Sequence, residues 1–367
     1  MRTGITILVF LLVFLGFSCK RPEITSGKFV FVATGNVKGK LVPHNVRRNP
    51  YGGLARKATY IHSLEEQGYD PIILDAGELF FGSNVTHNPS AEKVAANTKV
   101  VVQGYNLIGC DVLNLGYTDL ARDEYLLSEL QNVARFPFVS SNIVVKHSGK
   151  QIFKPYVIIE RSGFKFGVIG LTTRLPKGLG DYELLDPVKT GNEFLKNIAN
   201  STDYQIVLFN GTYDEAIQAR GAFVDADYMF LSGHSEAPRK RYPPEEGPLL
   251  YKLGEFGQSL AVIRLNVEDS DFPIEDISML IEREKFILRT LNILRGGNTS
   301  RTLEELYAGN LNTSNRVKRI KEELAAVQQR LSSATNTSEF EFVHMSKLVE
   351  EDSTLSRIIR EMGRVTD

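Results

Sequence analysis

Residues 28–39 read KFVFVATGNVKG, an apolar run that passes directly into a polar loop with two glycines. The run is short, rich in Val and Phe, and continuous, so it predicts a strand that is buried on both faces. The glycines and the asparagine of the loop mark the end of that strand. Because open α/β sheets place their sites at the carboxyl ends of strands, this loop is the first candidate for a functional site.

The same texture recurs along the chain to about Val267 and alternates with helical patterns. Continuous apolar runs predict further strands at residues 71–74, 111–115, 136–140, 166–171, 205–209 and 228–231, and two more within 251–267. Leu54, Ala58, Ile61 and Leu64 lie on one face of a predicted helix over residues 54–67, and two more helices follow Ser90 and include Leu126. This alternation predicts a layered α/β domain of about 240 residues.

After Asp271 the pattern becomes helical. Val317, Ile320, Leu324, Val327 and Leu331 follow a 3-4-3-4 spacing, which is the seam of a short coiled coil over two heptads. Two interpretations remain open for residues 271–367. They form a helical hairpin that folds on itself or on the α/β domain, or they form a tail that binds a protein partner or a second copy.

The N-terminus has the pattern of an export signal. Arg2 precedes an apolar run from Ile5 to Phe17, which is too short to span a bilayer but suits the core of a signal peptide. Residues 1–19 resemble a bacterial lipoprotein signal, which implies cleavage and lipidation at Cys19, a linker over residues 20–27, and an extracytoplasmic chain held on the cell envelope. An uncleaved hydrophobic anchor is the alternative. Cys110, in an apolar stretch, is then an inert buried thiol.

The amino-acid composition excludes some classes of protein and of binding partner. Of the 367 residues, 42% are hydrophobic, and 43 Lys and Arg oppose 44 Asp and Glu, giving a formal charge of −1. This composition excludes a disordered chain. The balanced charge also provides no overall attraction to nucleic acid or to an anionic membrane, so no nucleic-acid partner is expected and the lipid is the expected membrane contact.

Motifs at the predicted strand ends carry a family resemblance. In chain order they are Asn36-Val37-Lys38, Asp75-Ala76-Gly77-Glu78, Gly116-Tyr117-Thr118-Asp119, Asn210-Gly211 and Gly233-His234-Ser235-Glu236. Their order and spacing resemble the calcineurin-like metallophosphoesterases, specifically the 5′-nucleotidase branch, over about residues 28–268. Framework segments such as Gly254-Glu255-Phe256-Gly257 are similar as well. The resemblance implies a four-layer α/β/β/α sandwich, to which residues 271–367 add a helical region.

In that family two divalent metals, about 4 Å apart, generate hydroxide and hold the phosphoryl oxygens. The resemblance places Asn36, Glu78, Asn210, His234 and Glu236 at metal-ligand positions, and only His234 keeps the family residue. Lys38 replaces a ligand histidine, and a protonated ammonium cannot bind a metal. Thr118 replaces the catalytic histidine, so the catalytic residue of any reaction here is unknown.

These departures predict a metal-free, degenerate site. We expect Lys38 to occupy the place of a metal between Glu78 and Glu236, in a cleft that also contains Asp75, Tyr117 and Thr118, and we expect no cofactor. The oxygen atoms of the remaining residues leave open a remodelled divalent-metal site, which suits Ca²⁺ or Mg²⁺ better than Zn²⁺. The sequence therefore predicts an envelope lipoprotein that binds or assembles; the alternative is a metal-dependent phosphoester hydrolase.

Overall fold

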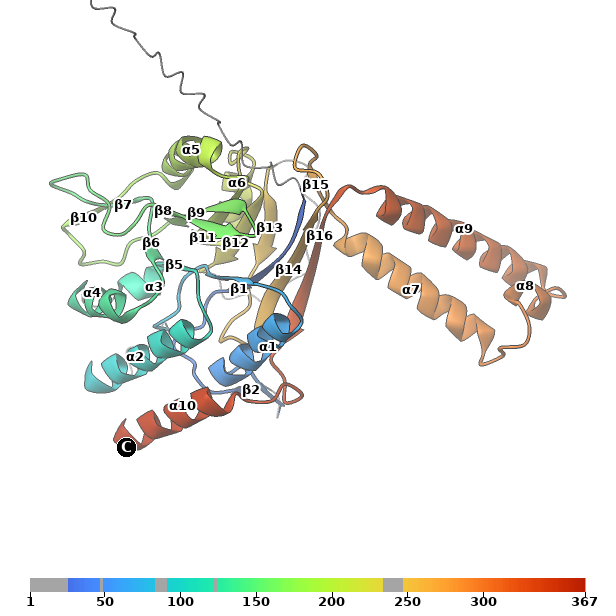
Figure 1. The fold of residues 1–367 in the computed structure, drawn as a ribbon, viewed down its shortest axis with the longest axis horizontal. Coiled ribbons are helices and arrows are strands. Elements are labelled where there is room, and N and C mark those ends of the chain that lie inside the picture. Colours follow the sequence, from blue (N-terminus) through green and yellow to red (C-terminus); the bar gives the residue numbers. More distant parts are fainter. Residues whose placement is uncertain (1–25, 47–48, 83–90, 122–123, 234–246, 367) are drawn as a thin grey trace, which may run out of the picture.

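Two β-sheets pack face to face, and helices cover the outer face of each sheet (Figure 1). This computed structural model describes residues 26–46, 49–82, 91–121, 124–233 and 247–366. The four layers confirm the expected α/β/β/α sandwich. Residues 1–25 lie outside the described residues, and so do the expected signal peptide, Cys19 and most of the expected linker.

The larger sheet has seven strands, with β1 near its centre. β1 pairs in parallel with β4 and antiparallel with β14. In spatial order the strands are β15 (Ile274–Asp276), β16 (Asn336–His344), β14 (Ser259–Val267), β1 (Gly27–Thr34), β4 (Ile72–Asp75), β5 (Val112–Asn114) and β6 (Phe138–Val139).

The second sheet has five strands, and all but its edge strand β8 run parallel to their neighbours. In spatial order they are β13 (Leu249–Lys252), β12 (Tyr228–Ser232), β11 (Tyr204–Asn210), β9 (Phe164–Thr172) and β8 (Tyr156–Arg161). Two antiparallel pairs complete the strands: β2 (His44–Val46) with β3 (Asn49–Tyr51), and β7 (Ile143–Val145) with β10 (Tyr182–Leu184).

The first quoted strand is buried on both faces, as its continuous apolar run predicts. Phe29 and Phe31 point between the sheets, where Phe29 meets Phe166 edge-on at 5.0 Å between ring centroids. Val30 and Val32 point the other way into the core beneath the helices. Full burial of each such side chain contributes roughly 1.5–3 kcal/mol, so β1 links the two main cores of the fold.

Helices cover both outer faces. On the seven-stranded sheet these are α1 (Leu54–Glu66), α2 (Ala91–Leu107), α4 (Glu124–Val133) and α10 (Ser353–Thr366), with the short α3 (Tyr117–Leu120) beside α4. On the five-stranded sheet they are α5 (Pro187–Ile198), the 3₁₀ turn Ala199–Ser201 and α6 (Tyr213–Arg220).

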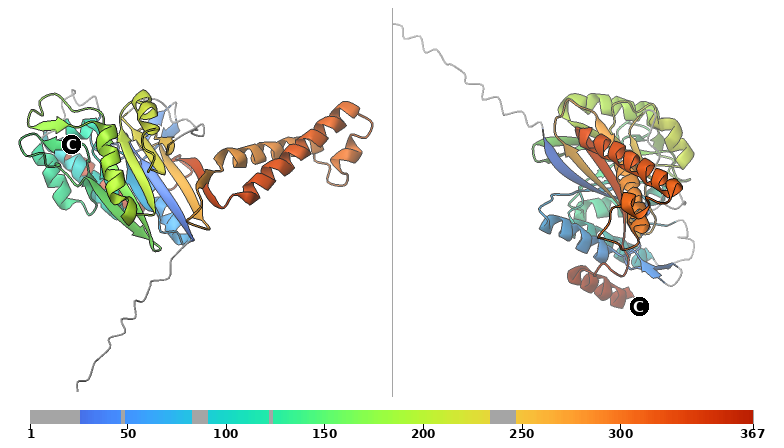
Figure 2. Two further views of the ribbon diagram at one scale, coloured as in Figure 1. Left: turned by 90° about the horizontal axis from the view of Figure 1, so that it is seen from above. Right: turned by 90° about the vertical axis from the view of Figure 1, so that its right-hand side faces the viewer.

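A pair of long helices projects from the edge of the seven-stranded sheet (Figures 1 and 2). We call this segment the arm; it comprises α7 (Ser278–Arg295), α8 (Leu303–Leu306) and α9 (Leu311–Ser333). Val317 and Val327 of the predicted seam are buried, as is Ile287 of α7, because α7 and α9 pack along each other. Within residues 278–333 the helices thus fold on themselves as a hairpin, while binding of a partner or a second copy stays a prediction.

The prediction that residues 271–367 form one helical region is wrong. Strand β16 follows the arm and pairs with β14 from Ser259↔His344 to Asn266↔Thr337, inside the seven-stranded sheet. Helix α10 then packs on α1 and α2, and its Leu355 is buried. The boundary after residue 268 therefore does not separate two domains, since the chain returns to complete the sandwich.

Cys110 is a free, buried cysteine, as expected. Burial raises the pKa of its thiol far above the ordinary value, so the reactive thiolate is not populated at neutral pH. Within the described parts of the chain, none of the helices is both long and apolar enough to cross a bilayer.

Candidate functional site

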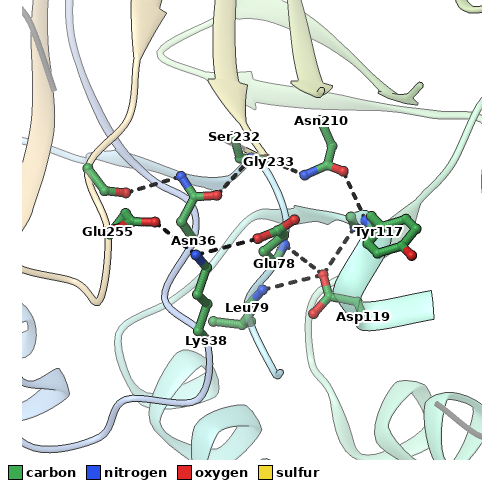
Figure 3. A network of polar contacts seen from close by, with 12 residues as sticks. Asn36, Lys38, Glu78, Leu79, Tyr117, Asp119, Asn210, Ser232, Gly233 and Glu255 are labelled. Atoms are coloured by element: carbon green, nitrogen blue, oxygen red, sulfur yellow. Dashed lines mark hydrogen bonds and ion pairs between the residues drawn. The ribbon is translucent and has the colours of Figure 1, made fainter. Parts of the chain in front are cut away.

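The candidate site lies where the carboxyl ends of strands from both sheets meet. The loops after β1, β4, β11 and β12, together with the start of α3, place polar side chains around one point (Figure 3). The parallel pairings β1–β4 and β11–β12 bring these ends together. The structure thereby unites the predicted residues Asn36, Lys38, Glu78, Tyr117 and Asn210.

The backbone of the first two loops is held in an unusual conformation. Asn36, Lys38 and Glu78 have φ angles of 54°, 56° and 57°, in the left-handed region that non-glycine residues enter at a cost of about 1–2 kcal/mol. Three hydrogen bonds connect the loops: from Asn36 N to the carbonyl of Gly77 at 2.9 Å, from Lys38 N to that of Glu78 at 2.8 Å, and from Gly39 N to that of Leu79 at 2.8 Å. These bonds offset the strain and fix the direction of all three side chains.

The side chain of Asn36 is fully buried and joins two other loops. Its Oδ1 accepts a hydrogen bond from Gly233 N at 2.7 Å, and its Nδ2 donates to the carbonyl of Gly254 at 3.3 Å. The amide thus ties the loop after β1 to the loops after β12 and β13.

Asn210 has the same role at the end of β11. Its Oδ1 accepts from Tyr117 N at 2.9 Å and from Thr172 Oγ1 at 3.2 Å, and its Nδ2 donates to Ser232 Oγ at 2.9 Å. Ser232 Oγ in turn donates to the carbonyl of Ala76 at 2.6 Å, so this chain of bonds crosses between the sheets.

The Lys38 ammonium is bound by a carboxylate that the sequence did not indicate as its partner. Nζ lies 2.8 Å from Oε1 of Glu255 and 3.9 Å from Oε2 of Glu78, and it also faces the Phe256 ring at 5.4 Å (Figure 3). Glu78 is thus an ion-pair neighbour rather than the hydrogen-bond partner. Glu236, the other expected partner, lies outside the described residues. The available signal for Glu255 was its place in the framework segment Gly254-Glu255-Phe256-Gly257.

Glu78 is buried, and this burial raises the pKa of its carboxyl above the ordinary value. The charges of Lys38 and Arg174 oppose the increase.

Sequence reasoning missed Arg174, whose guanidinium lies 5.3 Å from the centre of the Tyr117 ring and donates to the carbonyl of Gly233 at 3.3 Å. No motif indicated it, because it lies in the segment after β9.

Asp119 anchors the loop that carries Glu78. Its buried carboxylate accepts from the backbone N–H groups of Glu78, Phe80 and Gly116 at 2.7, 2.9 and 3.1 Å, and from that of Leu79 at 3.3 Å. Burial raises the pKa of Asp119 to about 7, while the N–H donors act in the opposite direction by stabilising the charged form. Asp119 therefore holds the loop that carries Glu78 in place.

The prediction that Asp75 lines the cleft is wrong. It is fully buried beneath the site and accepts hydrogen bonds from Thr34 Oγ1 and Tyr105 OH, both at 2.8 Å. Side chains alternate along β4, and Asp75 shares the face of Ile73, which points toward α1 and α2. There Lys57 lowers the pKa of the Asp75 carboxyl against the increase caused by burial.

Thr118 is buried beside Tyr117, and its hydroxyl has no hydrogen-bond partner among the described residues. A threonine hydroxyl does not change its protonation state near neutral pH, whereas an imidazole does. Thr118 therefore does not provide the acid–base chemistry expected of a histidine at this place.

The donor atoms of the described site do not fit a two-metal centre. The oxygens of Asn36 and Asn210 already accept hydrogen bonds, and the Lys38 ammonium lies beside Glu78. Over the described parts of the chain, three His, Cys, Asp or Glu side chains do not converge on any point where they could hold a metal. His234 and Glu236, the other two candidate ligands, lie outside those parts.

Comparison with known proteins places this geometry in context. A 5′-nucleotidase of Vibrio cholerae is 28% identical over 230 residues, covering 56% of this chain and 40% of that protein. Protein UshA of Escherichia coli K12 is 26% identical over 216 residues, covering 52% of this chain and 38% of UshA. The chain thus spans about two fifths of the length of these curated relatives. No protein-family model matches it.

Solved structures agree on the fold. The 5′-nucleotidase precursor of Thermus thermophilus superposes with a TM-score of 0.63 at 16% identity, covering 92% of this chain and 59% of that chain. The chain is thus similar in sequence to 5′-nucleotidases over about half of its length, and similar in fold to calcineurin-like phosphoesterases. The calcineurin-like phosphoesterase YfkN of Bacillus subtilis, with a TM-score of 0.61 at 17% identity, covers 93% of this chain and matches over 98% of its own. This likeness agrees with the order in which the motifs occur along the chain.

Proposed function

We propose that this protein is a bacterial envelope lipoprotein with a degenerate 5′-nucleotidase-like fold. It acts as a binding protein or as an assembly protein, not as a metal-dependent hydrolase. In this proposal Cys19 carries the lipid and holds the chain on the extracytoplasmic side of a membrane. The site at the strand ends serves as a structural junction rather than a two-metal hydrolase.

One observation carries the proposal: the ammonium of Lys38 stands beside Glu78 and is hydrogen-bonded to Glu255 at 2.8 Å. An ammonium has three donors and no lone pair, so it cannot be a metal ligand and it repels a divalent cation. In the low effective dielectric of a largely buried site, this repulsion is stronger than in water. The loops are thus held together by charge pairing that needs no metal.

The hydrogen-bond network supports the same function. A ligand oxygen in an active centre must offer a lone pair to the metal. Asn210 Oδ1 already accepts two hydrogen bonds, from Tyr117 N and Thr172 Oγ1, and Asn36 Oδ1 accepts one from Gly233 N. These bonds connect loops from both sheets, which stiffens this edge of the sandwich. A rigid edge of this kind suits binding or assembly.

The proposal predicts no metal-stimulated phosphoesterase activity. Purified protein is assayed with a generic aryl phosphate and with nucleoside monophosphates, in Mn²⁺, Mg²⁺, Ca²⁺ or Zn²⁺. We expect turnover at the level of the buffer and no change for Glu78→Ala. Metal-dependent turnover that Glu78→Ala abolishes contradicts the proposal and supports the second candidate, a phosphoester hydrolase with a remodelled metal site. The names of the curated relatives favour that candidate.

The anchor is tested separately. We expect wild-type protein expressed in a bacterial host to incorporate labelled fatty acid and to sediment with membranes. Cys19→Ser removes the only side chain that is expected to receive the lipid, so label and lipid-dependent sedimentation are both lost. Cys110→Ser is the matched control, because that thiol is buried, and it is expected to keep the label. Labelling that persists in Cys19→Ser contradicts lipidation at this cysteine.

A further inference from the structure

The arm carries its charge unevenly along its length. Residues 278–333 contain ten Lys and Arg against six Glu, whereas the whole chain has a formal charge of −1. Near the sheet the charges balance, with four of each sign in residues 278–288 and 320–333. The distal section, residues 289–319, has six cations against two acids. The entire excess of four positive charges therefore lies at the end farthest from the sandwich (Figure 2).

Ion pairs occur in both sections of the arm, and Lys318 of the distal section pairs with Glu322 at 3.9 Å. Arg283 pairs with Glu323, and Arg330 pairs with Glu275 at 2.9 Å. Lys321 engages Glu304 at 2.6 Å, which neutralises one of the two distal acids. Among the described residues, four distal arginines have neither an acidic partner within ion-pair distance nor a side-chain hydrogen bond: Arg289, Arg295, Arg316 and Arg319. The fifth, Arg301, donates only to the backbone carbonyl of Glu305.

The same end exposes aliphatic side chains. Ile293 and Leu311 are 78% and 74% exposed, and the aromatic Phe286, in the section nearer the sheet, is 59% exposed. Met279, Phe286 and Ile293 recur every seven residues, so they form one stripe along α7 that is separate from the buried seam facing α9. Arg289 lies on this stripe between Phe286 and Ile293. On α7, Arg289 is thus exposed beside the apolar side chains of Phe286 and Ile293. Exposed basic and apolar side chains together are also found in helices that lie at a membrane interface.

Sheet topology places the base of the arm beside the start of the described chain. Gly27, the first residue of β1, pairs with Val267, and the neighbouring Asn266 pairs with Thr337, next to the residue that begins β16. With strands about 4.8 Å apart, the base of the arm lies within ~15 Å of Gly27. The eight residues from Cys19 to Gly27 reach at most ~28 Å. A lipid at Cys19 therefore keeps the base of the arm near the bilayer, and the 18-residue α7 extends about 27 Å from that base.

We propose that the distal end of the arm binds the surface of an anionic phospholipid bilayer, as a second membrane contact beside the lipid. The proposal rests on the lipid anchor proposed above, which brings the surface within reach. Four unpaired arginines supply attraction to anionic headgroups, and each basic residue near such a surface contributes about 1 kcal/mol. Ile293 and Leu311 enter the boundary with the acyl chains. They would gain nothing from nucleic acid, whose surface is charged and polar.

Vesicle binding tests this proposal without the lipid. The chain from Lys20, which keeps every described residue, is mixed with vesicles of phosphatidylcholine alone or with about one third phosphatidylglycerol, and flotation is measured. We expect binding only to the anionic vesicles, weakened by added salt. Arg289→Glu/Arg319→Glu is expected to weaken binding at least tenfold, and Ile293→Ser/Leu311→Ser several-fold. Both pairs are exposed, so the thermal unfolding midpoint should not change.

The matched control is Lys150→Glu/Lys196→Glu, which makes the same change in net charge on exposed residues of the sandwich. It should bind like the unmodified chain. An equal loss in the control, or equal binding to neutral vesicles, overturns the proposal.

Sedimentation velocity without vesicles tests whether the stripe binds a second copy instead. A dimer that Phe286→Asp dissociates assigns the stripe to a second copy and overturns the membrane assignment. Because the assay uses unlipidated protein, its failure leaves lipidation at Cys19 unaffected, and failure of labelling at Cys19 leaves the vesicle result intact.

Discussion

Asp119→Ala is expected to lower the free energy of unfolding by about 4 kcal/mol. The carboxylate accepts hydrogen bonds from four backbone N–H groups, those of residues 78, 79, 80 and 116. Each buried donor that loses its partner costs about 1–3 kcal/mol, and the lower limit for all four gives this value. Urea unfolding followed by circular dichroism measures the change.

Thr118→Val is the matched control for Asp119→Ala. Thr118 is the preceding residue, is also buried, and its hydroxyl has no partner among the described residues. Its replacement by an apolar side chain of similar shape should change the free energy of unfolding by less than about 1 kcal/mol. A similar cost for the two variants would show that packing, and not the N–H acceptor, is what Asp119 provides.

Lys38→Met is expected to convert the site into one that binds divalent cations. The substitution removes the ammonium and leaves the carboxylates of Glu78 and Glu255, which the ammonium holds on either side. Oxygen ligands of this kind suit Mg²⁺, Ca²⁺ and Mn²⁺. Isothermal titration should show at least tenfold tighter binding of Mn²⁺ by Lys38→Met than by the wild-type chain.

The pH dependence of this binding has a defined sign. Burial raises the pKa of Glu78, and Lys38 opposes the increase, so the pKa rises further when Lys38 is removed. A metal must displace the proton from Glu78, and its affinity for Lys38→Met should therefore increase as the pH is raised. Lys38→Arg keeps the charge and should bind no better than the wild-type chain. Equal affinity in Lys38→Arg and Lys38→Met would contradict the role of the ammonium.

The sandwich could be predicted because its strands are continuous apolar runs. In β1 and β9 nearly every residue is buried, either between the sheets or under helices, and such runs are visible in a single sequence. The arm was similarly visible, since the seam that includes Val317 and Val327 has helical spacing. Both signals come from local periodicity.

Strand β16 could not be predicted from the local pattern of hydrophobic residues. Residues 336–344 alternate, with Asn336, Ser338 and Phe340 buried and their neighbours half-buried. Two of these inward positions are polar, so the alternation does not stand out in hydrophobicity. Their burial is possible because Asn336 caps the backbone at residues 268 and 269, and Ser338 bonds to Tyr228. Only the partner strands reveal those bonds.

The location of the site could be predicted from the sequence, but the carboxylate that binds Lys38 could not. The motifs after each strand identified Asn36, Lys38 and Asn210, which do meet at one edge. The partner of Lys38 depended on the path of the loop after β13, which brings Glu255 to the ammonium across 217 positions in the sequence. Asp75 was misplaced because the direction of its side chain follows from the alternation of β4 against the helices.

The central claim is that this site holds a lysine ammonium in place of metal. The most direct test is the metal content of purified wild-type protein after incubation with Mn²⁺ and Zn²⁺ and removal of free ions, measured by elemental mass spectrometry. We expect less than about 0.1 metal ion per chain, because the Lys38 ammonium beside Glu78 repels a divalent cation. Two tightly held ions per chain, lost in Glu78→Ala, would contradict it.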